Sequence, residues 1–182
     1  HESDRWQRTD RLGWHPRAHR CMPDHPDTIA DGRSGLWVDA APGAPPVSPE
    51  SGRLGFWVGE WALTWEGGSG RNVIRELHGG RAVLETFSAD RPDELEGNSI
   101  SVWDSRHGCW AQTWWDNHGS VFQLTGDFVG TDLVLRTAPE SDGSLYRMTF
   151  AKITASSLEW EWARSSRSGE FEPMWIVHYH RT

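Results

Sequence analysis

The chain has almost no lysine and no long apolar run. Lys152 is the only lysine, the arginines are scattered, and the formal net charge is −8. Because binding to nucleic acid needs clustered Lys and Arg to neutralise phosphates, no nucleic-acid partner is expected. No stretch approaches the length of about eighteen apolar residues that a membrane helix needs, so no membrane span is expected either.

Cysteine and the common catalytic motifs are equally scarce. Cys21 and Cys109 are the only cysteines, no CxxC occurs, and the sequence leaves their pairing open. No signal-peptide pattern is present, so a cytoplasmic location is the expectation. No phosphate-binding glycine motif and no Ser-His-Asp order occurs. No cofactor is therefore expected.

Residues 1–53 differ in kind from the rest of the chain. They contain most of the ten prolines and show neither strand nor helix periodicity, which predicts an irregular, Pro-rich N-terminal arm. His15, His19, Cys21 and His25 are zinc-ligand types, but their spacing matches no familiar site, so no metal site is predicted. A few apolar residues of the arm are expected to pack on the barrel described next or to cover its mouth: Trp6, Trp14, Leu36, Trp37 and Val38.

Residues 54–182 consist of short β-branched and aromatic runs separated by turn residues, which is typical of an all-β domain. Consecutive strands joined by hairpins favour a closed antiparallel β-barrel of about 8–10 strands, with room for one small ligand. A two-sheet sandwich is the alternative. A short helix over Leu54–Gly59 could plug one end. The strands are expected at 60–65, 72–78, 81–88, 98–104, 109–116, 120–127, 132–137, 145–152, 157–164 and 173–181.

Several motifs in this region resemble those of one bacterial family. The segment Phe56–Trp61 is FWVGEW and resembles the opening signature FxFWxGEW of a large, mostly uncharacterised family of small bacterial proteins. The segment Trp110–Gly119 is similar to the family hairpin WxQxWxDNxG. The resemblance implies a lipocalin-like (calycin) barrel and hardly restricts the function. Further similar segments are Gly79-Gly80 with Glu85, Asn98–Asp104, Arg147 with Phe150, Trp162, and Tyr179–Arg181.

The aromatic composition is strongly biased toward tryptophan. Thirteen Trp stand against six Phe and two Tyr, and so many indoles in a small domain line either a thick core or the wall of a cavity. Strand alternation assigns one aromatic face to each strand, and we expect these faces to point inward. The predicted ligand-binding residues are Trp61, Trp65, Phe87, Trp110, Gln112, Trp114, Trp160, Trp162, Trp175 and Tyr179.

Two carboxylates share these inward faces. Glu85 and Asp116 are candidate catalytic residues, because a carboxyl group inside an apolar wall tends to have a raised pKa. Arg147 is the natural counter-ion, provided that its strand turns that side inward. The alternative is a structural Glu–Arg–Gln network that only stabilises the barrel.

Three functions are compatible with this pattern. The first is a protein that binds a small apolar or aromatic molecule in the cavity. The second is a cofactor-free isomerase, cyclase or lyase that acts on a secondary metabolite by acid/base catalysis in the same cavity. The third is an interaction module whose arm binds a partner or a second copy of the chain, which leaves a homodimer open.

Overall fold

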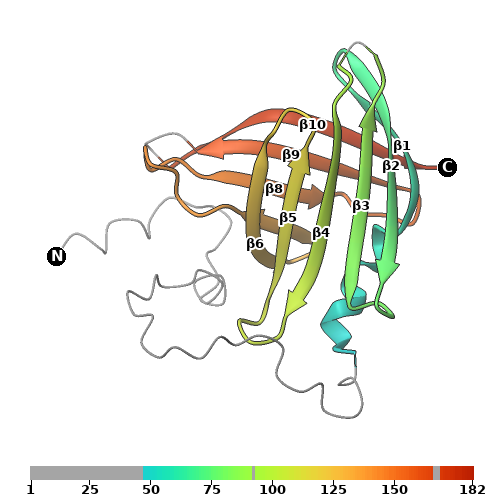
Figure 1. The fold of residues 1–182 in the computed structure, drawn as a ribbon, viewed down its shortest axis with the longest axis vertical. Coiled ribbons are helices and arrows are strands. Elements are labelled where there is room, and N and C mark those ends of the chain that lie inside the picture. Colours follow the sequence, from blue (N-terminus) through green and yellow to red (C-terminus); the bar gives the residue numbers. More distant parts are fainter. Residues whose placement is uncertain (1–46, 92, 166–168) are drawn as a thin grey trace.

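The computed structural model describes residues 47–91, 93–165 and 169–182. Ten strands form a closed barrel in which neighbours in sequence are neighbours in the sheet, and β1 pairs with β10 to close it. Figure 1 shows β3–β6 crossing the orange and red strands β8–β10 at a steep angle. The strands are β1 (Gly59–Trp65), β2 (Gly68–Leu77), β3 (Ala82–Ala89), β4 (Glu96–Asp104), β5 (Cys109–Asp116), β6 (Val121–Val129), β7 (Asp132–Arg136), β8 (Tyr146–Ala151), β9 (Ser157–Ser165) and β10 (Phe171–Arg181).

One 3-10 helix, η2 (Pro49–Phe56), lies at one end of the barrel (cyan in Figure 1). Pro49 is at its start, and the Ser48 side chain accepts a hydrogen bond from the backbone N–H of Glu50. Both residues are of the types that favour the start of a helix. Leu54 and the following Trp57 are each only 1% exposed. The Trp57 ring meets Phe150 edge-to-face, with 5.0 Å between centroids. This aromatic contact closes the barrel at the end where η2 lies.

Arg181 joins the end of the chain to η2. Its guanidinium donates hydrogen bonds to the carbonyl oxygens of Phe56, Val58 and Ala155, at 2.8, 2.8 and 2.9 Å. The same group lies 4.2 Å from the centroid of the Trp61 ring. The planar guanidinium can make these contacts at once because its donors point in fixed, divergent directions.

The all-β fold and the closed antiparallel barrel are confirmed, and the sandwich alternative is wrong, because the strands form one continuous closed sheet. All ten expected strands are present. The largest difference is the start of β2, at Gly68 instead of Asn72. The expected helix over Leu54–Gly59 begins earlier and ends at Phe56.

Several expectations fall on residues outside the described part of the chain. They are the irregular course of residues 1–46, the apolar contacts of the arm, and the cluster of His15, His19, Cys21 and His25. The boundary expected at residue 53 falls within η2. Among the described residues, no helix has both the length and the apolar character that crossing a membrane would require.

Candidate functional site

A cavity of about 130 Å³ lies inside the barrel, at the end opposite η2. Its polar lining comes from Glu85, Asp116 and Tyr179. Several aromatic lining residues are only half-buried, so the cavity opens to solvent between the strand ends. The apolar and aromatic lining residues are Phe87, Leu95, Trp114, Phe122, Leu124, Met148, Trp160, Trp162, Trp175 and Val177.

The aromatic residues of the wall contact one another around the barrel. Trp175 on β10 lies nearly perpendicular to Trp160 and to Phe87, with centroids 5.5 and 5.9 Å apart. Trp160 and Trp162 on β9 have parallel rings, and Phe122 on β6 meets Trp162 at 5.0 Å. Edge-to-face pairs of this kind add stability beyond the area they bury. The ring contacts therefore hold the cavity wall in shape.

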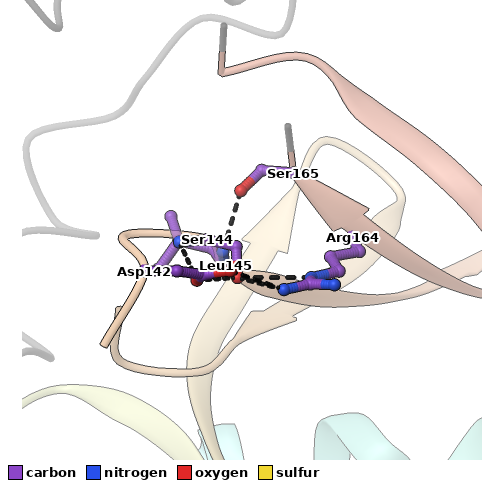
Figure 2. Close-up of polar contacts among 5 residues, drawn as sticks. All are labelled: Asp142, Ser144, Leu145, Arg164 and Ser165. Carbon is purple, nitrogen blue, oxygen red and sulfur yellow. Dashed lines mark hydrogen bonds and ion pairs between the residues drawn. The ribbon is translucent and has the colours of Figure 1, made fainter. Parts of the chain in front are cut away.

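Polar contacts hold the loop between β7 and β8 against the end of β9 (Figure 2). Arg164 donates to the Asp142 carboxylate at 2.8 Å and to the hydroxyl oxygen of Ser144 at 3.0 and 3.2 Å. The backbone N–H of Leu145 donates to the Ser165 hydroxyl at 2.8 Å. The next residue, Tyr146, stacks on the cavity residue Trp162 at 5.2 Å. The hydrogen bonds thus hold the loop that leads into Tyr146, which packs on the aromatic wall.

The main polar group of the cavity is the Glu85 carboxyl group on β3. Asn72 on β2 donates to its Oε1 at 2.6 Å, and the Ser99 hydroxyl on β4 donates to its Oε2 at 2.5 Å. The same Asn72 amide donates to the Tyr179 hydroxyl on β10 at 3.0 Å. All four side chains are buried. Residues of β2, β3 and β4 therefore meet at the carboxyl group, and Asn72 connects them to Tyr179 on β10.

Burial controls the protonation of this cluster. It raises the pKa of Glu85 to about 7, against the lowering effect of the hydrogen bonds from Ser99 and Asn72. Burial also raises the pKa of Tyr179 well above its usual value, and the nearby Glu85 charge adds to this rise, while the hydrogen bond from Asn72 opposes it. Glu85 can therefore exchange a proton near neutral pH, whereas Tyr179 stays protonated.

Asp116, the second expected carboxylate, has a different environment at the end of β5. Burial raises its pKa, but hydrogen bonds from Ser120, Trp114 and His118 outweigh that effect and the pKa is lowered. Two of these bonds come from the turn, from the backbone N–H groups of His118 and Ser120 at 3.0 and 2.9 Å. The third comes from the Trp114 indole at 3.1 Å. Asp116 thus holds the turn and orients an indole of the wall.

Arg147 does not lie beside Glu85, which corrects the expected ion pair. Met148 and Phe150 lie on the buried face of β8. Arg147 has the opposite parity and therefore faces outward. There it donates to the Glu161 carboxylate at 2.8 Å. Its guanidinium also lies 4.3 Å from the centroid of the Phe171 ring. The Glu–Arg–Gln network is likewise absent from the described residues, since Gln112 donates to Ser101.

The expected ligand-binding residues divide into three groups. Six line the cavity: Phe87, Trp114, Trp160, Trp162, Trp175 and Tyr179. Trp65 does not line it but contacts Trp175 at 5.2 Å. The other three are buried in the core away from the cavity lining: Trp61, Trp110 and Gln112. Strand parity identified inward residues correctly, but it could not say how far along the barrel each one lies.

Sequence reasoning did not include several site residues. Phe122 and Leu124 alternate along β6, so parity could have found them. Val177 was on a predicted inward face but was not proposed as a ligand contact, and the face of Met148 was left open. Asn72 and Ser99 gave no signal, because a small polar residue in a strand is usually solvent-exposed.

No family model matches this chain, and no curated protein matches it. Among solved structures, the chain is similar to a protein of unknown function of the DUF3598 family from Nostoc punctiforme PCC 73102. The two are 8% identical, the match covers 75% of this chain and 100% of the other, and the TM-score is 0.25. The resemblance to the bacterial family with the FxFWxGEW opening therefore stays a prediction, and the site rests on this chain's own residues.

Proposed function

We propose that the protein binds a small apolar or aromatic molecule in the barrel cavity. The observation that carries this proposal is the cavity itself, whose wall is made mainly of indole and phenyl rings with a few converging polar groups. Concave, mostly apolar sites with few polar groups are the usual form of small-molecule sites. An indole-rich wall also offers flat surfaces against which an aromatic ligand can stack.

The cavity size limits the ligand to about one ring. Its volume is about 130 Å³, and an apolar cavity of about 150 Å³ is known to hold one benzene molecule. We therefore expect single-ring compounds to fit without rearrangement. Larger fused systems would need side chains of the wall to move or part of the ligand to remain in the opening.

Two neighbouring tryptophans on β5 provide a matched test. Trp114 lines the cavity, whereas Trp115 faces outward and is 42% exposed. Calorimetric titration with single-ring compounds such as benzyl alcohol, toluene and phenol is expected to show binding. Trp114→Phe should weaken it about 3–10-fold, on the scale of one aromatic contact, and Trp115→Phe should leave it within about twofold because that side chain does not reach the cavity. Folded protein that binds none of these compounds, or equal losses in both variants, would contradict the proposal.

A second candidate, acid/base catalysis in the same cavity, is favoured by one observation. Glu85 has a pKa near neutral pH and lies in the cavity lining, and a general acid or base works best when its pKa is close to the working pH. In this function Glu85 moves a proton on a bound substrate while the wall excludes water. Turnover of a bound compound that persists in Glu85→Gln would exclude Glu85 from that role.

A further inference from the structure

We infer that the ligand of this cavity is a cation, namely a small aromatic amine whose ammonium group pairs with Glu85. The inference rests on the proposed binding function and names its ligand class. The charge of the lining and the hydrogen bonds of Glu85 support it.

The cavity lining contains acidic groups and no basic one. Glu85 and Asp116 are its carboxyl groups, and of the described residues that line it, none is Lys, Arg or His. A buried carboxylate is ordinarily paired with a cation. Glu85 has two hydrogen-bond donors, Asn72 and Ser99, and in the described part of the chain it forms no ion pair. An ammonium group supplied by the ligand would provide the missing positive charge.

Two arginines of the barrel contact other groups. Arg147 faces outward and pairs with Glu161. Arg181 lies against the Trp61 ring and the carbonyl oxygens near η2. Of the described residues that line the cavity, the titratable ones besides Glu85 are Tyr179 on β10 and Asp116 on β5.

Hydrogen-bond capacity near Glu85 also favours a donor-rich ligand. Each Glu85 oxygen accepts one bond from the protein and keeps a free lone pair. An ammonium group carries several N–H donors and no acceptor, so it complements this arrangement of acceptors.

The aromatic wall has the same preference. Indole faces attract cations more strongly than other aromatic side chains do, and the attraction is greatest where water is excluded. Trp160 and Trp175, whose planes are 84° apart, both line the cavity. A carboxylate ligand would instead meet two acidic groups and the negative faces of these rings. The wall therefore selects for positive charge and against negative charge.

Three probes of matched shape test the inference: benzylamine, benzyl alcohol and benzoate, titrated calorimetrically into the full chain. We expect benzylamine to bind at least tenfold more tightly than benzyl alcohol at pH 8, and benzoate not to bind. Below the Glu85 pKa of about 7, benzylamine must displace a proton. Its affinity should therefore fall up to about tenfold for each pH unit below that value, while benzyl alcohol should show no such trend.

Two variants separate the carboxylate from general charge effects. Glu85→Gln should reduce benzylamine binding to the level of benzyl alcohol and abolish its pH dependence. Binding of benzyl alcohol to this variant reports that its cavity is still folded. Glu60→Gln removes the same charge from an exposed site on β1, where Glu60 faces Arg71 at 3.3 Å, and should leave both affinities unchanged.

The outcomes distinguish the inference from the function on which it rests. Benzyl alcohol binding as tightly as benzylamine to the wild-type chain would overturn the amine inference while leaving a neutral-ligand site. An unchanged amine preference in Glu85→Gln would overturn the role of Glu85. Failure of benzylamine and benzyl alcohol alike to bind folded wild-type protein would refute the proposed binding function as well.

Discussion

At the scale of single residues, the Glu85 carboxyl group is both buried and part of the cavity lining. Three of its neighbours, Asn72, Ser99 and Tyr179, lie on three other strands, so the carboxyl group is positioned by the barrel as a whole. Its two donors favour the charged form and burial favours the neutral one, and burial has the larger effect. The protonation of such a group responds strongly to any charge that enters the cavity.

The balance predicts how stability changes with pH. The pKa of Glu85 is about 7 in the folded chain, above its ordinary value of 4.5, so the folded state binds the proton more tightly. Its contribution is fully present below about pH 4.5 and is lost as pH rises to about 7, by up to about 1.4 kcal/mol per pH unit. Glu85→Gln cannot titrate and should lack this loss. Urea unfolding of both proteins should show the variant gaining stability relative to the wild type between pH 4.5 and 7.

Glu60→Gln is the matched control for this experiment, because Glu60 is exposed on the outer face of β1. Groups such as Asp116 titrate in all three proteins, so their effects cancel in the comparison. A constant difference between Glu85→Gln and the wild type across this pH range would show that Glu85 keeps its ordinary pKa in the folded state.

At the scale of elements, the pairing of β4 with β5 places a glycine beneath a cavity indole. Gly97 pairs with Asp116, and a Cβ atom added at Gly97 would lie 2.1 Å from Cζ2 of Trp114. The Trp114 ring is held on its other sides by Asp116 at 3.1 Å and by Phe87 at 6.0 Å between centroids. Because position 97 has no side chain, the Trp114 ring can occupy its place in the cavity wall.

Gly97→Ala should displace the Trp114 ring and break its bond to Asp116. We expect ligand affinity to fall about tenfold or more, because a displacement near 1 Å is large on the scale of a fitted site. The near-ultraviolet circular dichroism of the indoles should change as well. Gly55→Ala is a suitable control, since an added Cβ there has no atom within 4 Å. Unchanged affinity in Gly97→Ala would show that the Trp114 position does not shape the site.

Sequence patterns predicted the elements well, since each depends on local chemistry. The pair Gly79-Gly80, with φ of 65° and 85°, produces the turn between β2 and β3. Alternation in β5 separates Trp114, on the cavity side, from the exposed Trp115. Strand existence and order, and the inward face of most strands, could therefore be predicted from neighbouring residues, whereas the face of β8 could not.

The site could be predicted only in part, because it depends on the stagger of the strands. Asn72 pairs with Phe87 across the sheet, yet its amide reaches Glu85 on the same strand as Phe87. Tyr179 reaches Asn72 across β1, over 107 positions of sequence. Strand alternation gives the face of a residue but neither its height in the barrel nor its partners. This is why Arg147, a plausible partner of Glu85 by composition, pairs with Glu161 instead.

At the scale of the whole molecule, nine of the ten strand pairings join consecutive strands, and one joins β1 to β10. That last pairing brings Trp61 opposite Arg181. Pairing β1 with β10 closes a loop that contains all the other strands. The chain must lose the conformational entropy of that loop before these contacts contribute, whereas a hairpin such as β6–β7 closes only a short turn. We therefore expect the barrel to close late in folding, after the hairpins have formed.

Two substitutions test this order through folding kinetics. Arg181 makes its contacts at the closure, with Phe56, Val58 and Ala155, so Arg181→Ala should mainly accelerate unfolding, with a φ-value below about 0.3. Leu133, 1% exposed in the β6–β7 hairpin, should give a φ-value above about 0.5 as Leu133→Ala and slow folding. Each change is expected to cost more than about 1 kcal/mol, enough for a usable φ-value in stopped-flow experiments. If Arg181→Ala slows folding as much as Leu133→Ala does, the closure forms with the hairpins, and pairing of the chain ends is part of the folding nucleus.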